Sequence, residues 1–257
     1  DAPWTGHGIG SFEAKYMDYQ ADYFKEYGSQ NRYAMLADNV KQPFNEYLGV
    51  LINFGIVGLA LLLGMVGALV YCYRQNPTQE KKIALYILLS IGVFSFFSYP
   101  FMYPFTWMVT FLAVLMLTAD YLKRIKIGTW GRNIIYSAAL MGFFWGQVRL
   151  GARTQSERSW QEASELALCH SYDEALPYVS LKHRFKDNPY FLYNYAAVFT
   201  EAKEYEKALK VALECRKYWA DYDLELLLGD IYREKKDYKQ AEEYYMSASY
   251  MCPSRFL

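Results

Sequence analysis

An uninterrupted apolar run at residues 48–73 constrains the fold of this chain more than any other feature of its sequence. The run contains no charged side chain. As a helix with a rise of about 1.5 Å per residue, it would cross the roughly 30 Å hydrocarbon core of a bilayer. Shorter apolar runs follow at residues 83–99, 105–120 and 134–148. We therefore predict an all-α chain with about four transmembrane helices in residues 48–149, although the fourth run, taken alone, is also typical of a buried helix in a soluble protein.

The loops between these runs predict how the helices are oriented. The loops after the first and third runs are basic, and they contain Arg74, Lys81, Lys82, Lys123, Arg124, Lys126 and Arg132. The turn between the second and third runs carries no charge. Because basic loops stay in the cytoplasm, we expect residues 1–47 and 150–257 on the opposite side, in the periplasm of a bacterial inner membrane.

The overall composition excludes some classes of protein. The 27 basic and 27 acidic side chains cancel, so the chain has no global positive field that would gather nucleic acid. The four cysteines are widely spaced and form neither a disulfide framework nor a metal-binding pair. The chain begins without a methionine, inside a glycine-rich stretch, so we expect it to be the C-terminal part of a longer protein.

Residues 150–257 form a third segment, and they contain a repeat with a period of 33 residues. Small residues recur at two positions of this repeat, and they are Ala163, Ala196 and Gly229, then Ala175, Ala208 and Ala241. Aromatic or large apolar residues recur beside them. The pattern resembles the tetratricopeptide repeat, which implies an α-solenoid of about three helix pairs. Such arrays usually offer a groove to a protein partner, but a spacer or packing module for the membrane part fits the sequence equally well.

Residues 1–47 are neither a span nor a repeat, and we expect them to be an external loop segment. Gly6, Gly8 and Gly10 favour a tight turn, because the spacing and preceding strand of a dinucleotide-binding loop are missing. Helical spacing then places aromatic residues on one stripe of a helix that Gly28 ends, and they are Phe12, Tyr16, Tyr19, Tyr23 and Tyr27. This helix is expected either at the membrane interface or packed against other spans.

Short motifs on either side of this loop resemble the O-antigen ligase and polymerase family. They are a Gly-x-Gly-x-Gly-x-Phe turn, an Asn-x-x-Leu and a Phe-Gly-x-x-Gly-Leu, and their residues are Gly6, Gly8, Gly10, Phe12, Asn45, Leu48, Phe54, Gly55, Gly58 and Leu59. The resemblance implies a multi-span glycosyltransferase of the cell envelope, active for example in lipopolysaccharide biosynthesis. Its donor would be an undecaprenyl-diphosphate-linked glycan and its acceptor a lipid, glycan or protein, with no cofactor and no metal. The family commonly has histidine before the asparagine, where this chain has Phe44.

Such a reaction needs cationic groups over the diphosphate and a group that activates the acceptor hydroxyl. The candidates for catalysis are Arg32, Lys41 and His7, and those for substrate binding are Arg32, Lys41 and Asn45. Alternatively, the two cations are solvated loop charges and Asn45 caps the first span. The second hypothesis for the whole chain is a membrane-anchored repeat scaffold for envelope assembly, without catalysis. A transporter fragment ranks third, because the spans contain almost no ionisable residues.

Overall fold

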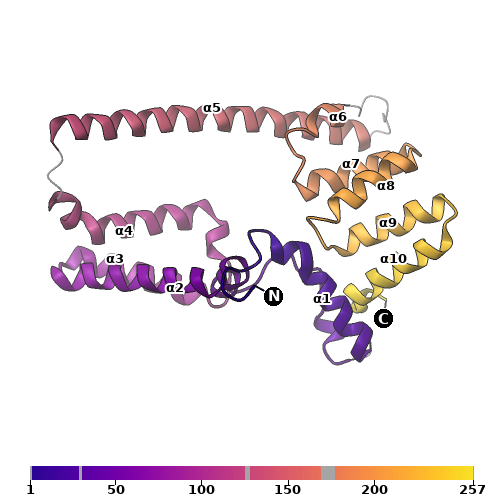
Figure 1. Ribbon diagram of the computed structural model, residues 1–257, viewed down its shortest axis with the longest axis horizontal. Coiled ribbons are helices and arrows are strands. Elements are labelled where there is room, and N and C mark those ends of the chain that lie inside the picture. Colours follow the sequence, from indigo (N-terminus) through magenta and orange to yellow (C-terminus); the bar gives the residue numbers. More distant parts are fainter. Residues whose placement is uncertain (1, 29–30, 125–127, 169–176, 257) are drawn as a thin grey trace. The chain divides into compact units, whose positions relative to one another are not determined.

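The computed structural model describes residues 2–28, 31–124, 128–168 and 177–256, and all regular elements in these ranges are helical (Figure 1). The all-α prediction is therefore confirmed for the described residues. The α-helices are α1 (Ser11–Tyr27), α2 (Glu46–Gln75), α3 (Gln79–Phe94), α4 (Pro104–Arg124), α5 (Thr129–Leu168), α6 (Pro177–Leu181), α7 (Pro189–Glu201), α8 (Tyr205–Cys215), α9 (Tyr222–Glu234) and α10 (Tyr238–Met251). Three short 3₁₀ turns are η1 (Ala34–Leu36), η2 (Pro100–Met102) and η3 (Pro253–Arg255).

The chain divides into two compact units that do not follow the order of the sequence. The first unit contains Asp1–Phe12 and Lys41–Asn133, and the second contains Glu13–Val40 and Ile134–Leu257. Residues 1–47, taken in the sequence as one segment, are thus shared between both units. The predicted boundary near residue 150 falls inside α5, which is one continuous helix from residue 129 to residue 168.

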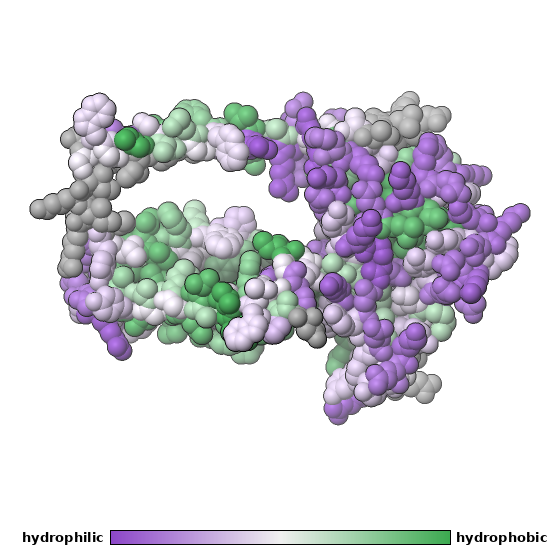
Figure 2. Space-filling model, viewed as in Figure 1, coloured by the Kyte–Doolittle hydropathy of each residue, from purple (hydrophilic) through white to green (hydrophobic). Residues whose placement is uncertain are grey.

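Two helices of the first unit are long and apolar enough to cross a membrane, namely Glu46–Gln75 and Pro104–Tyr121. Few of their residues are buried within the described protein, and in Figure 2 apolar side chains gather over α2, α3 and α4. The second predicted run becomes α3, which ends at Phe94 instead of reaching residue 99 because the chain turns at Ser95. With 16 residues, α3 is about 24 Å long. The fourth run lies inside α5.

A small apolar cluster and a buried ion pair hold α2, α3 and α4 together. Leu69, Ala84, Ala113 and Leu117 make up the cluster. At its edge the buried Lys81 Nζ lies 2.6 Å from the Asp120 carboxylate, which also accepts a hydrogen bond from Asn76 (2.7 Å). These contacts join α2, α3 and α4 to one another at one end.

In the second unit, α7 with α8 and α9 with α10 form two helical hairpins whose helices begin at positions that repeat after 33 residues. Asn188 caps α7 and Asp221 caps α9 with their side chains, each accepting from a backbone N–H of the first turn. The second helix of each pair begins at Tyr205 and at Tyr238. The 33-residue period of the sequence is therefore also the spacing between equivalent helix starts in these two copies.

The turn inside each hairpin is also the same. Lys203 (φ 61°) and Lys236 (φ 65°) adopt the left-handed conformation. The next residue in each copy donates its N–H to a carbonyl five residues earlier, Glu204 to Phe199 and Asp237 to Tyr232, each at 2.9 Å. This is the Schellman arrangement, which satisfies carbonyls that the end of a helix leaves unpaired.

The predicted close contacts between the helices of a pair are present. Ala163, Ala196, Ala208, Gly229 and Ala241 are all buried, whereas Ala175 lies outside the described residues. A methyl group on Gly229 would lie 2.5 Å from the ring of Tyr245, so only glycine fits against this ring. The small residues thus do what the repeat pattern predicts.

Helix α1 exists as predicted and ends before Gly28, whose φ is +83°. The side of α1 that packs in this unit is not its aromatic stripe. Met17 and Phe24, two turns apart, are the fully buried residues, whereas Tyr19 and Tyr27 are 66% and 60% exposed. Tyrosines tolerate water through their hydroxyl groups, so their helical spacing did not mark the packed side of α1.

Candidate functional site

Helix α2 is interrupted at Gly55, where residues 2–8 cross it. In a regular helix the N–H groups of Ile56 and Val57 would donate to the carbonyls of Ile52 and Asn53. Here they donate to Pro3 (2.9 Å) and Trp4 (3.1 Å) instead, while the freed carbonyls accept from His7 (2.8 Å) and Gly8 (3.0 Å). We call these residues, 2–8 and 52–57, the glycine crossing.

The crossing brings the two glycine motifs together and explains why they contain glycine. A Cβ on Gly6 would lie 2.4 Å from the carbonyl carbon of Asn53, and one on Gly55 would lie 2.4 Å from that of Trp4. Gly55 also has φ 65° and ψ −164°, a conformation reserved for glycine. At Gly58 a Cβ would meet the side chain of Phe54 at 2.3 Å. Gly6 and Gly55 thus allow two backbones to touch, and Gly58 makes room for the side chain of Phe54.

The other glycines of the motif act differently. Gly8 and Gly10 have positive φ values of 89° and 84°, but open space surrounds the position of a Cβ on each. They shape the turn that leads into α1, where Phe12 is half-buried. The crossing is closed on this side by the hydroxyl of Ser11, which donates to the side-chain oxygen of Asn53 (3.3 Å).

Asn45 is the N-cap of α2, as the alternative interpretation of the sequence had it. Its side-chain oxygen accepts from the N–H of Leu48 (2.9 Å), and its amide nitrogen donates to the carbonyl of Phe96 (3.2 Å). The neighbouring Glu46 carboxylate accepts from the N–H of Phe101 (2.9 Å). The oxygen of the Asn45 amide thus caps α2, and its nitrogen ties the start of α2 to the chain between α3 and α4.

The predicted cations do not gather in one unit. Arg32 belongs to the second unit, where its exposed guanidinium donates to the hydroxyl of Tyr33 and lies 4.6 Å from the centroid of that ring. Lys41 belongs to the first unit and is half-buried. His7 is exposed on the turn of the glycine crossing. Arg32 and His7 are therefore exposed, whereas Lys41 is half-buried.

The sequence did not reveal that Glu13–Val40 packs on the C-terminal helices within the second unit. The Arg216 guanidinium donates to the carboxylates of Asp18 and Glu225. Glu225 is only 2% exposed, and its burial raises the pKa of its carboxyl above the ordinary value, although Arg216 acts in the opposite direction. One guanidinium thus links helix α1 to α9.

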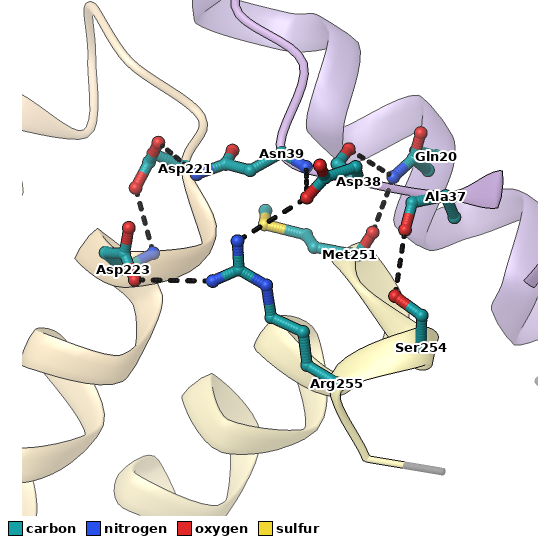
Figure 3. A network of polar contacts seen from close by, with 9 residues as sticks. All are labelled: Gln20, Ala37, Asp38, Asn39, Asp221, Asp223, Met251, Ser254 and Arg255. Carbon is teal, nitrogen blue, oxygen red and sulfur yellow. Dashed lines mark hydrogen bonds and ion pairs between the residues drawn. The ribbon is translucent and has the colours of Figure 1, made fainter. Parts of the chain in front are cut away.

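A second set of polar contacts holds the end of this segment (Figure 3). The amide of Gln20 donates to the carbonyl of Met251 (2.6 Å), and the hydroxyl of Ser254 donates to that of Ala37 (3.1 Å). The figure also shows three side-chain contacts, between Asn39 and Asp221 (2.8 Å), Arg255 and Asp38 (3.4 Å), and Arg255 and Asp223 (3.8 Å). The segment is therefore bound along its length.

A groove lies in the first unit, between α3 and α4. It is an apolar groove of about 390 Å³, lined by Ile83, Tyr86, Ile87, Ser90, Ile91, Phe105, Thr106 and Val109. Its lining offers no charged group for catalysis. In the described part of the chain, no group of three or more metal-binding side chains comes together either.

Comparison with protein families, with curated proteins and with solved structures gives no match to this chain.

Proposed function

We propose that this chain is the C-terminal part of a membrane glycan transferase of the O-antigen ligase or polymerase type. The observation that carries the proposal is the glycine crossing. Residues of two motifs, separated by more than forty positions in the sequence, meet backbone to backbone at Gly6 and Gly55. The two motifs need each other's glycines in order to pack, which gives a physical reason for their occurring together. This pair of motifs is the one that resembles the family.

The proposal includes the finer parts of the fold. Residues 56–75 alone form a helix of about 30 Å, so the hydrocarbon core would begin near Gly55 and the glycine crossing would lie at its external border. In this proposal α2 and α4 cross the membrane, and α3 and the first half of α5 cross it as well. The hairpins α7–α8 and α9–α10 are interpreted as tetratricopeptide repeats, because their caps and turns recur after 33 residues.

The orientation is testable by introducing one cysteine at a time and labelling it with a membrane-impermeant maleimide in intact spheroplasts. Burial raises the pKa of Cys215 to about 12 and that of Cys252 to about 11, so both thiols should stay protonated and unreactive near neutral pH. With Cys72 and Cys169 changed to serine, we expect labelling of Lys186→Cys but not of Pro77→Cys. The reverse pattern would invert the proposed topology.

In the proposed reaction, Arg32 and Lys41 are the candidate cations for the diphosphate of the lipid-linked donor on the external side, each within its own unit. A guanidinium grips two phosphate oxygens at once, whereas an ammonium acts as a point charge. Asn45 serves the reaction only indirectly, because its amide is engaged at the start of α2. His7, exposed on the crossing, is the candidate base for the acceptor hydroxyl.

The test is glycan transfer in the bacterium that encodes the chain, at matched protein levels. Losing a charged hydrogen-bonding partner of the diphosphate costs about 1.5–3 kcal/mol, so Arg32→Ala should reduce transfer roughly 10- to 100-fold. Arg32→Lys should recover only part of that loss. Lys25→Ala is the matched control, since Lys25 is an exposed cation of the same segment. Full transfer in both Arg32→Ala and Lys41→Ala would contradict the proposed site.

The second candidate function is a membrane-anchored scaffold whose repeats bind another protein, without catalysis. The engagement of Asn45 as a helix cap favours it, because this removes one residue from the candidate binding site. Unchanged transfer in the Arg32 and Lys41 variants, combined with loss of envelope assembly on disruption of the repeats, would support the scaffold over the transferase.

A further inference from the structure

The C-terminal helices of the second unit present a composite surface to Glu13–Val40. Its apolar part consists of Ala220, Tyr222, Ala248, Met251 and Cys252, which enclose the fully buried Met17. Next to it, Phe24 packs with Ala34 and Ala37 under the partly buried Tyr250. The surface therefore encloses Met17 directly, and Tyr250 adds a contact beside Phe24.

Charged and amide groups around this apolar surface recognise the segment specifically. Asp18 directly follows Met17 and meets Arg216, which Glu225 holds in place from the repeat side. Gln20 then reaches the carbonyl of Met251 at the end of α10. A carboxylate and an amide at these positions are matched by a cation and an acceptor, so binding needs more than apolar burial.

The segment has little to hold it folded by itself. Helix α1 has 17 residues, and most of the stability of such a helix comes from packing of its amphipathic face rather than from helix propensity. Its fully buried Met17 packs in a cluster whose other buried members come from residues 220–252, whereas Phe24 packs with Ala34 and Ala37 of the segment itself and with Tyr250. The backbone N–H of Ala220 also donates to the carbonyl of Glu13 (3.1 Å). The folded form of the segment therefore depends on the surface that it contacts.

We propose that α9 and α10, with Arg216 before them and Ser254 after them, form a binding site whose ligand is Glu13–Val40 of the same chain, and that this segment folds as it binds. The partner that these helices recognise is then an internal peptide: an amphipathic helix with an acidic residue after its first apolar anchor, followed by an extended stretch. This inference stands independently of the proposed glycan transfer.

The test empties the site in the full chain and then offers it the segment as a separate peptide. Met17→Asp places a carboxylate in the apolar cluster, and Asp18→Arg opposes Arg216 with a like charge. Both full-length variants, in detergent, are titrated with a fluorescent peptide of residues 13–40. Tyr19→Asp is the matched control, because Tyr19 is exposed on the same helix. Hydrogen exchange of α9 and α10 reports whether the repeats stay folded.

We expect the peptide to bind the Met17→Asp and Asp18→Arg chains at least 100-fold more tightly than the unmodified chain, whose own segment occupies the site at an effective concentration near the millimolar range. The Tyr19→Asp chain should behave like the unmodified chain. Peptide carrying Met17→Asp should bind at least tenfold more weakly than the unmodified peptide. Absence of binding to both emptied chains, or equal binding to all chains, would overturn the proposal.

Arg32 lies within the segment, so under the proposed function the repeats would also control how this cation is presented to the donor. Met17→Asp should then reduce glycan transfer as strongly as Arg32→Ala does. Peptide binding without any effect of Met17→Asp on transfer would leave the binding site established and contradict only the role of Arg32.

Discussion

Replacing Gly55 by alanine should destabilise the first unit by about 2–6 kcal/mol. A side chain at φ 65° and ψ −164° costs about 1–3 kcal/mol in backbone strain. The added methyl would also meet the backbone of Trp4 at 2.4 Å, and relieving such an overlap costs about 1–3 kcal/mol more. Unfolding of the full chain in mixed detergent micelles measures the loss.

Gly64→Ala is the matched control, since Gly64 lies in the same helix with open space where its Cβ would be. We expect a change of at most about 1 kcal/mol there, in the stabilising direction. Gly6→Ala should resemble Gly55→Ala, and the double variant should cost less than the two losses combined, because either methyl already separates the same two backbones. Equal stability of the Gly55→Ala and Gly64→Ala chains would contradict the glycine crossing.

Arg216→Ala should destabilise the second unit by about 3–5 kcal/mol. The substitution leaves the buried Glu225 carboxylate without its cation and also releases Asp18 of α1. Hydrogen exchange of α9 in the full chain measures the effect. Arg233→Ala is the control, because Arg233 forms exposed ion pairs with Asp230 and Glu234, and solvent screening leaves such pairs little effect on stability.

The loss at Arg216 should depend on pH with a definite sign. The folded-state pKa of Glu225 is raised by burial, and removing Arg216 removes the influence that lowers it. A carboxyl with a raised folded pKa favours the folded state below its unfolded pKa of about 4.3, and this contribution is lost as pH rises through the folded pKa. The Arg216→Ala defect should therefore be largest near neutral pH and shrink toward pH 5. Arg216→Ala with Glu225→Gln should restore part of the stability at neutral pH, and a defect that grows on acidification would contradict this account.

Features of the fold that recur along the chain could be predicted from the sequence. The apolar run at residues 48–73 became α2 because length and hydrophobicity are local properties. The 33-residue period placed Ala196, Ala208 and Gly229 in buried positions, since stacked helix pairs need small residues at the same point of each copy. The end of α1 was predictable because glycine is favoured after a helix.

Contacts between distant parts of the chain could not be predicted in the same way. The break at Gly55 lies inside a long apolar run. Only the contact with residues 2–8 shows why the helix is interrupted there. The pairing of Asp18 with Arg216 joins residues 198 positions apart, for which neither side chain carries a local signal. For the same reason, the sequence did not show that Arg32 and Lys41 belong to different units.

The packing of Glu13–Val40 on the C-terminal helices also sets an order of events during synthesis. Ala37 and Ser254 are separated by 217 residues, and a bacterial ribosome adds about 5–20 residues per second. The segment therefore waits about 10–40 s before its binding surface has been made, whereas residues 2–8 meet their partners at residues 52–57 within about 10 s. During that wait Met17 lacks its partners at residues 220–252, so the nascent chain is most open to proteases in this interval, and a truncation before α10 would prolong that exposure.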